Sequence, residues 1–184
     1  MKPLLALLAV AILSAALPAP TRLTLTSESQ LSISGTSSVH DWTCTIDDVD
    51  GALDVTYTGE TLQTLNHVTV TVQADAIACK NRTMNRKTRA ALNAKAHPSI
   101  VFELTAAEIT DAYVQISGNA TVAGTTQPLM FRAEAKALGP GRFRFTGEVP
   151  LLMSDFGIKP PTAMLGTLKT GDAITIAFDV VADA

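Results

Sequence analysis

The chain has 184 residues, a net charge of −3, and 47% hydrophobic but only 5% aromatic and 17% charged residues. The negative charge and the lack of a basic arm argue against a general nucleic-acid binder. Thr, Val and Ile, which favour pleated surfaces, are frequent, so the composition indicates strands. The length suffices for one domain with a full hydrophobic core.

The N-terminus has the features of an export signal. A short positive end is followed by an uncharged run over residues 4–17, which Pro18 closes. The run is shorter than the roughly 20 apolar residues that cross a bilayer. We therefore predict a signal peptide in residues 1–19, cleaved near 16 to 19, and an exported domain over 20–184 that is not an integral membrane protein.

Apolar and polar residues alternate along most of the chain, which puts one face of each strand into a core. Turn residues separate the alternating runs, so the sequence predicts an all-β antiparallel meander that closes into a barrel or a sandwich. The runs are Leu23/Leu25, Leu31/Ile33, Trp42/Cys44/Ile46, Leu53/Val55/Tyr57, Val68/Val70/Val72, Ile100/Phe102/Leu104, Val114/Ile116, Phe143/Phe145 and Ile174/Ile176/Phe178/Val180. The predicted turns are Asp50-Gly51, Thr58-Gly59, Gly118-Asn119, Gly124, Gly139-Pro140-Gly141 and Thr170-Gly171-Asp172.

One segment, residues 82–96, departs from this alternation. Met84, Thr88 and Leu92 recur at helical spacing ahead of Pro98, which predicts a single short helix or helical loop. Six cations gather here with no acidic residue before Glu103, namely Lys80, Arg82, Arg86, Lys87, Arg89 and Lys95. Two interpretations stay open: a solvated helix face, or an anion site for a pyrophosphate or lipid head group formed by Arg82, Arg86 and Arg89.

The two cysteines allow one bridge, Cys44 to Cys79, and export brings the chain into an oxidising compartment. We predict this disulfide, with a pair of buried free thiols as the alternative. Neither cysteine has a partner at the short spacing of a zinc motif. His40 and Cys44, four apart on one strand face, would lie roughly 13 Å apart, so we predict no metal site.

The segment 154–166 contains Pro160-Pro161, which removes two consecutive backbone donors and cannot lie in a central strand. It is therefore a loop, but an apolar one that includes Phe156 and Met164. An apolar loop folds back over something. A plug at the end of a barrel and a lid over a ligand are both consistent with the sequence.

Four stretches carry a resemblance to a known family. Residues 152–169 combine an Asp-Phe-Gly run with a Pro-Pro pair ahead of the last strand, and residues 35–42 read Gly-Thr-Ser-Ser-Val-His-Asp-Trp. Residues 91–104 pass through a proline into Ile-Val-Phe, and residues 118–127 match a hairpin motif with Ala120 in place of the commoner Leu. In their order and spacing they resemble YceI-like domain proteins, in the branch with a Gly-Thr-Ser-x-x-His-Asp-Trp opening.

The resemblance implies an eight-stranded antiparallel lipocalin-like barrel with one short helix, located in the periplasm or secreted. It further implies that the barrel holds an isoprenoid or other amphiphilic ligand, such as an isoprenoid quinone or a polyprenyl lipid, for storage, transport or stress protection, with no required cofactor. The alternative is a structural or stress-response protein whose filled barrel acts through surface partners. A homodimer is left open.

The barrel interior supplies the candidate ligand contacts, because eight strands enclose either packed side chains or one small ligand. These contacts are Trp42, Leu53, Val55, Val70, Phe102, Leu104, Val114, Phe143, Phe145, Phe156 and Met164. No enzyme is predicted, because His40 and Asp41 are consecutive strand residues that point to opposite faces. A catalytic site would need His40 and Asp155 to meet in one cleft.

Overall fold

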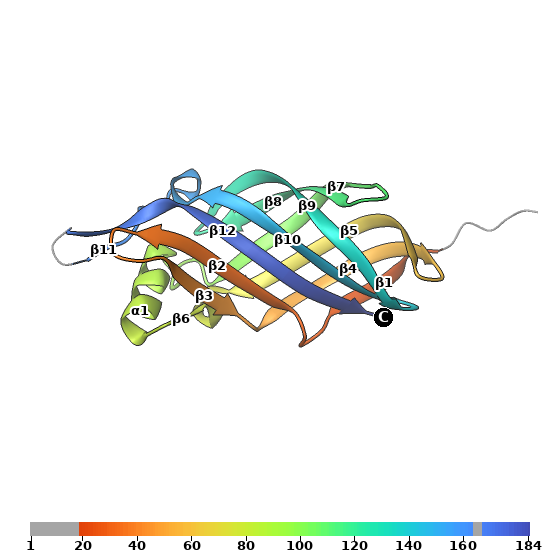
Figure 1. Cartoon of the computed structure of the whole chain (residues 1–184), viewed down its shortest axis with the longest axis horizontal. Coiled ribbons are helices and arrows are strands. Elements are labelled where there is room, and N and C mark those ends of the chain that lie inside the picture. The colour runs from red at the N-terminus through yellow and green to blue at the C-terminus, as the bar shows by residue number, and fades with distance from the viewer. Residues whose placement is uncertain (1–18, 164–166) are drawn as a thin grey trace, which may run out of the picture.

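The computed structural model describes residues 19–163 and 167–184, so the predicted signal peptide up to Pro18 and Met164 lie outside the described residues. The chain forms a coiled antiparallel sheet rolled around its long axis, with one helix at one end (Figure 1). The strands are β1 (Thr21–Leu25), β2 (Gln30–Ser37), β3 (Trp42–Ile46), β4 (Val49–Thr58), β5 (Thr61–Gln73), β6 (Ala78–Cys79), β7 (Ser99–Ile109), β8 (Val114–Val122), β9 (Thr125–Gly139), β10 (Arg142–Leu152), β11 (Thr162–Ala163) and β12 (Leu168–Asp183). The helices are η1 (Ala74–Ala76), α1 (Arg82–Ala91) and η2 (Met153–Phe156).

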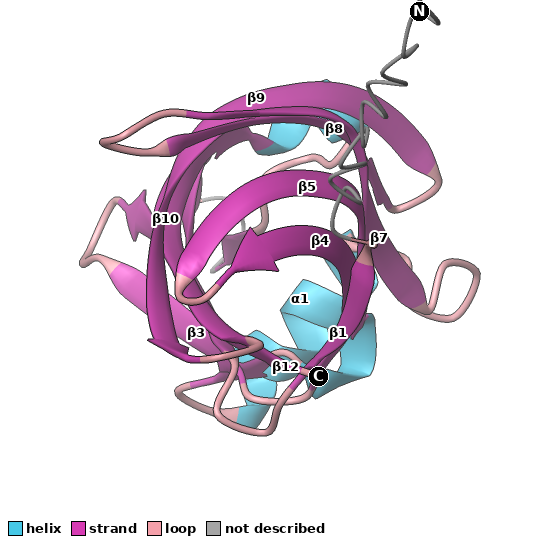
Figure 2. Cartoon of the chain, turned by 90° about the vertical axis from the view of Figure 1, so that its right-hand side faces the viewer, coloured by secondary structure: helices cyan, strands magenta, loops and turns pink. Residues whose placement is uncertain are grey.

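Eight of these strands form a closed ring in the order β1-β4-β5-β7-β8-β9-β10-β12, which Figure 2 shows end on. The ring closes where β1 pairs with β12, through Thr24 opposite Asp183 and Leu25 opposite Ala182. The prediction of an eight-stranded antiparallel barrel with one short helix is therefore confirmed.

The long strand β12 pairs with β10 along one edge and with β1 and β2 at different positions along the other edge. Its last residues pair with β1, whereas Ile174 to Asp179 pair with β2. From β2 the sheet continues through β3 to the two-residue strand β6. Toward the α1 end the wall is thus extended by β2, β3 and β6 instead of by β1.

The end of the barrel near the C-terminus is filled with side chains. Leu23 and Val55 are fully buried there, and Phe143 is 1% exposed. Phe143 packs edge-on against Tyr57, with ring centroids 5.5 Å apart. The members of this packed cluster, buried or half-buried, come from most strands of the ring, so they close this end of the barrel.

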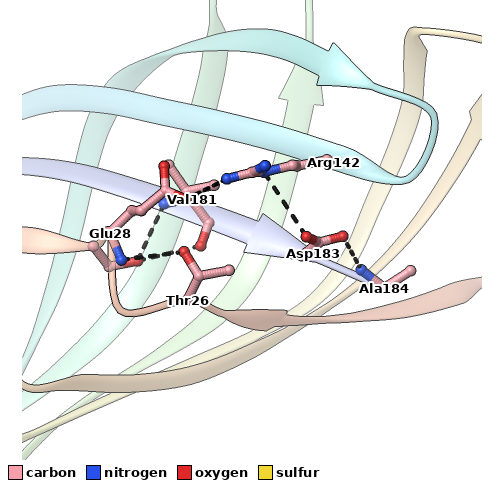
Figure 3. A network of polar contacts seen from close by, with 7 residues as sticks. Thr26, Glu28, Arg142, Val181, Asp183 and Ala184 are labelled. Carbon is pink, nitrogen blue, oxygen red and sulfur yellow. Dashed lines mark hydrogen bonds and ion pairs between the residues drawn. The ribbon is translucent and has the colours of Figure 1, made fainter.

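A polar network fastens the β1–β2 connection over the same end (Figure 3). Val181 lies at its centre: its N–H donates to Ser29 Oγ at 3.1 Å, and its carbonyl accepts from Thr26 N at 2.8 Å and from Ser29 Oγ at 3.2 Å. Arg142 of β10 forms an ion pair with Glu28 of the same connection. These contacts hold the chain between β1 and β2 against β12 and β10.

On the outer face of the barrel, Arg144 of β10 pairs with Asp179 of β12, with Nε donating to Oδ1 at 2.6 Å. These hydrogen bonds lower the pKa of Asp179 and raise the pKa of Arg144. Both side chains are more than two-fifths exposed, so water screens the pair and its contribution to stability is small.

The turns at Thr58-Gly59, Gly124 and Gly139-Pro140-Gly141 are confirmed, whereas three others were predicted wrongly. Asp50-Gly51, Gly118-Asn119 and Thr170-Gly171-Asp172 lie inside β4, β8 and β12. At Gly118 the reason is steric: a Cβ would stand 2.3 Å from the Phe102 ring. The glycine there makes room for an aromatic side chain and does not reverse the chain.

The predicted helix is confirmed as α1. Asn81 caps its first turn by accepting a hydrogen bond from Met84 N at 3.0 Å. The helix ends at Ala91 with Leu92 as its C-cap, and Asn93 follows in the left-handed region with φ 49°. The chain then passes Pro98 and enters β7.

The disulfide between Cys44 and Cys79 is also confirmed. The two residues stand opposite each other in the register of β3 and β6. Because β6 contributes only two residues to the sheet and α1 begins three residues after Cys79, the bridge fastens the start of the helix to the barrel wall.

Breaking this disulfide is expected to lower the free energy of unfolding by about 3 to 4 kcal/mol, because the bridge closes a loop with a sequence separation of 35. Urea denaturation of the oxidised and the reduced protein measures the difference. Titration of thiols in the unfolded oxidised protein is the control, and recovery of two free thiols would contradict the bridge.

Candidate ligand-binding site

A cavity of about 360 Å³ lies inside the barrel. Leu53 and Phe145, both members of the packed cluster, form part of its lining, and residues of α1 form another part. Most of the remaining lining consists of inward side chains of the strands, including Leu31, Ile33, Trp42, Cys44, Ile46, Val68, Val70, Val72, Ile100, Phe102, Leu129, Phe131, Ile174, Ile176, Phe178 and Val180. The volume lies within the range of about 300 to 1,000 Å³ that is usual for small-molecule sites.

The exposure of the inward side chains shows where the barrel is hollow. In the packed cluster, Leu23 and Val55 are 0% exposed. Along β12, the inward residues Ile174, Ile176 and Phe178 are only half-buried, although they face the interior and line the cavity. The cavity therefore lies beside the half-buried residues of β12, whereas Cys44 and Val72 line it as buried members of a second core cluster.

Helix α1 presents one face to the cavity. Its lining residues Met84, Lys87, Thr88 and Ala91, followed by Leu92 at the C-cap, have the spacing of neighbours along one side of a helix. This is the same periodicity that predicted the helix.

The three arginines that the sequence suggested for an anion site are exposed and do not line the cavity. Arg89 pairs with Asp75 at 2.9 Å, and it also donates to the Asp75 carbonyl. Arg82 and Arg86 lie on the parts of α1 that face away from the cavity lining. The cation that does line the cavity is Lys87, which the sequence analysis counted among the basic residues but did not place in a site.

The apolar loop after β10 closes a gap in the wall. The pairing of β9 with β10 ends at Gly147 opposite Ala133, so the two strands separate beyond that point. Phe156 and Ile158, 4% and 7% exposed, pack there with residues of β8, β9 and β10 and line the cavity. Gly157 between them adopts φ 69°, a left-handed conformation that turns the loop inward.

A polar contact holds this loop to the neighbouring strand, since Gln127 Nε2 donates to the Asp155 carbonyl at 2.7 Å. The part of the loop before residue 164 is therefore a piece of the barrel wall. Like a plug, it packs against the strands, and like a lid, it lines the cavity, so it has features of both alternatives that the sequence suggested.

The predicted contact residues fall into three groups. Trp42, Leu53, Val70, Phe102, Phe145 and Phe156 line the cavity. Val55, Leu104, Val114 and Phe143 belong to the packed cluster and do not line it. Met164 lies outside the described residues.

The lining contains few polar side chains, and within the described ranges these are Lys87, Thr88 and Thr170. Lys87 Nζ donates to the Thr162 carbonyl at 2.9 Å, which joins α1 to β11. Two of the three polar residues lie on α1, so the polar part of the lining is concentrated beside the helix.

A second, more open hollow of about 610 Å³ is more polar and is lined by Asp41 and Asp155. His40 is exposed and does not line this hollow, so the structure does not bring His40 and Asp155 together there. Trp42 borders both hollows, and its indole N–H donates to the Thr36 carbonyl at 3.1 Å. The first cavity is the better candidate site, because it is less open and more apolar and so removes more of a ligand from water.

Residues 19–163 and 167–184 contain no group of three or more His, Cys, Asp or Glu side chains placed to hold a metal ion. No helix in these ranges has both the length and the apolar character needed to cross a membrane.

The fold and the cavity define a lipocalin-like barrel with an internal apolar pocket. Residues 24–182 match the model of the YceI-like domain. Because this match spans most of the chain, the protein belongs to the YceI-like domain family.

Solved structures share the fold. BcnA of Burkholderia cenocepacia is 14% identical with a TM-score of 0.71, and the match covers 85% of this chain and 98% of that one. A polyisoprenoid-binding domain from Saccharophagus degradans, implicated in plant cell wall breakdown, is 11% identical with a TM-score of 0.68, covering 89% and 98%. The Campylobacter jejuni YceI protein is 18% identical with a TM-score of 0.64, covering 76% and 82%. No curated protein matches the sequence.

A matched pair of valines distinguishes the filled part of the barrel from the hollow part. Val55→Ala is expected to lower the free energy of unfolding by about 2 to 3 kcal/mol, because it opens a void among packed side chains. Val70→Ala should lower the free energy of unfolding by about 1 kcal/mol or less, because the Val70 side chain already borders the cavity. Urea denaturation measures both, and equal large losses would contradict a hollow interior.

Proposed function

We propose that the protein is an exported carrier or store of an amphiphilic small molecule, which it holds inside the barrel without catalysing a reaction. The observation that carries this proposal is the cavity inside the barrel, whose described lining is apolar except beside α1 and at Thr170. An apolar chain that enters such a cavity is removed from water, which stabilises the complex by about 25 cal/mol per Å² of apolar surface.

The distribution of polar groups also gives the ligand an orientation. The apolar tail lies toward Leu53 and Phe145, which belong to the packed cluster, and the polar head lies beside α1. The proposed contacts along the tail are Trp42, Leu53, Val70, Phe102, Phe145 and Phe156. An isoprenoid quinone or a polyprenyl lipid has this form.

Membership of the YceI-like domain family supports the same class of ligand, since one structure of the same fold is a polyisoprenoid-binding domain. The apolar cavity counts against the alternative of a filled barrel that acts only through its surface.

Export is supported by two features. The sequence pattern of residues 1–19 is that of a signal peptide, and the disulfide between Cys44 and Cys79 is typical of an oxidising compartment. We therefore place the domain of residues 20–184 in the periplasm or outside the cell.

The first test is to extract the purified protein with organic solvent and identify the extracted molecules by mass spectrometry. A protein that yields no amphiphile and also ignores added quinone would contradict the proposal. Binding can be followed through Trp42, because it is the only tryptophan of the chain and lines the cavity. A short-tailed isoprenoid quinone is expected to quench its fluorescence.

Adjacent alanines of α1 provide a matched pair of variants for this binding. Ala91 lines the cavity, whereas Ala90 is exposed and does not. Ala91→Phe is expected to weaken quinone binding by about tenfold or more, because the ring occupies space that the ligand needs. Ala90→Phe should leave the Kd unchanged, and equal effects of both variants would argue against binding in this cavity.

A further inference from the structure

Lys87 is the one charged residue in the described lining of the cavity. It is half-buried on the inner face of α1, and the next residue, Thr88, also lines the cavity. Thr170 supplies a second hydroxyl to the same lining. A long apolar pocket thus has a cation and two hydroxyl groups in a lining that is otherwise apolar.

The described surroundings of Lys87 do not neutralise its charge. An ammonium group has three N–H donors, and among the described residues one acceptor is provided, the Thr162 carbonyl. Arg89 on the same helix has the carboxylate of Asp75, but no described carboxylate forms an ion pair with Lys87. A partly buried cation beside apolar surface is stabilised when an anion joins it.

The charges near Lys87 also favour the binding of an anion. Arg82 and Arg86 are exposed on the same helix, and residues 76–102 contain no Asp or Glu. The chain as a whole has a net charge of −3, so this basic segment stands out from its average. A local excess of cations attracts anions to the adjacent part of the cavity.

We infer that the cavity selects a single-tailed amphiphile with an anionic head, a carboxylate or a phosphate, that binds Lys87 while its tail lies inside the barrel. This inference rests on the proposed function and specifies the head group of its ligand. Thr88 and Thr170 supply additional hydrogen bonds to the head. Lys87 is then the residue that distinguishes anionic from neutral amphiphiles.

The test compares each anionic probe with the alcohol of the same tail. Dodecanoate is paired with dodecanol, and farnesyl phosphate with farnesol, by titration calorimetry of the oxidised protein at low salt. The anionic member is expected to bind about tenfold more tightly, as a charge-assisted hydrogen bond allows, and added salt should reduce the preference. The pair that shows the preference identifies the head as carboxylate or phosphate.

Lys87→Met should abolish the preference because it weakens binding of the anionic probes more than binding of the alcohols, and Lys87→Arg should retain the preference. The matched control is Arg86→Met, which removes the same charge from an exposed position of the same helix and should keep most of the preference. This control distinguishes a direct contact between Lys87 and the head group from a general effect of positive charge on the helix.

Three results would overturn the inference. Equal binding of anion and alcohol to the unmodified protein would refute it while leaving the proposed function intact. Equal weakening of anions and alcohols by Lys87→Met would show that Lys87 only shapes the cavity through Thr162. If neither anions nor alcohols bind, the proposed function fails together with the inference.

Discussion

The structure depends on the edge of β12 that faces away from β10, because this edge pairs with β1 at one position and with β2 at another. Its C-terminal residues Ala182 and Asp183 close the ring by pairing with β1, and its earlier residues from Ile174 pair with β2. Where β1 closes the ring, the opposing strands are near enough for their side chains to meet, so this part fills. Where β2, β3 and β6 extend the wall, residues of β3 and β5 still pack in a second core cluster, and half-buried residues of β12 line the cavity beside them. The wall around the cavity thus follows from one change of strand partner, and the apolar lining follows from the same alternation that forms the strands.

The alternation in the sequence was sufficient to predict an antiparallel meander that closes into a barrel or a sandwich, and the family resemblance pointed to the eight-stranded barrel. The helical spacing from Met84 to Leu92 was sufficient to predict α1. Strand β9 was not recognised, because Ala133, Ala135 and Ala137 give little hydrophobic contrast and Pro128 interrupts the run. Glycine was also misread as a turn signal. Gly51 and Gly118 lie in strands where a Cβ would collide with neighbouring atoms, a requirement that depends on residues distant in the sequence.

The site could be predicted in part only. Alternation identifies which face of a strand points inward, but it does not give the position along the barrel axis. Leu53 and Val55 both point inward from β4, yet only Leu53 reaches the cavity. Lys87 was overlooked for a different reason: a lysine in a basic helix normally faces water, and only the packing of α1 across the cavity reverses that expectation.

The gap between β9 and β10 has a consequence for the rigidity of the barrel wall. Beyond Gly147, these strands are joined by the side chains of the inserted loop and by the contact of Gln127 with Asp155, and no longer by a backbone ladder. Side-chain packing can rearrange at lower cost than a ladder of hydrogen bonds can break. This seam is therefore the part of the wall where a rearrangement costs least, whereas the ring at the other end is fixed by its strand register.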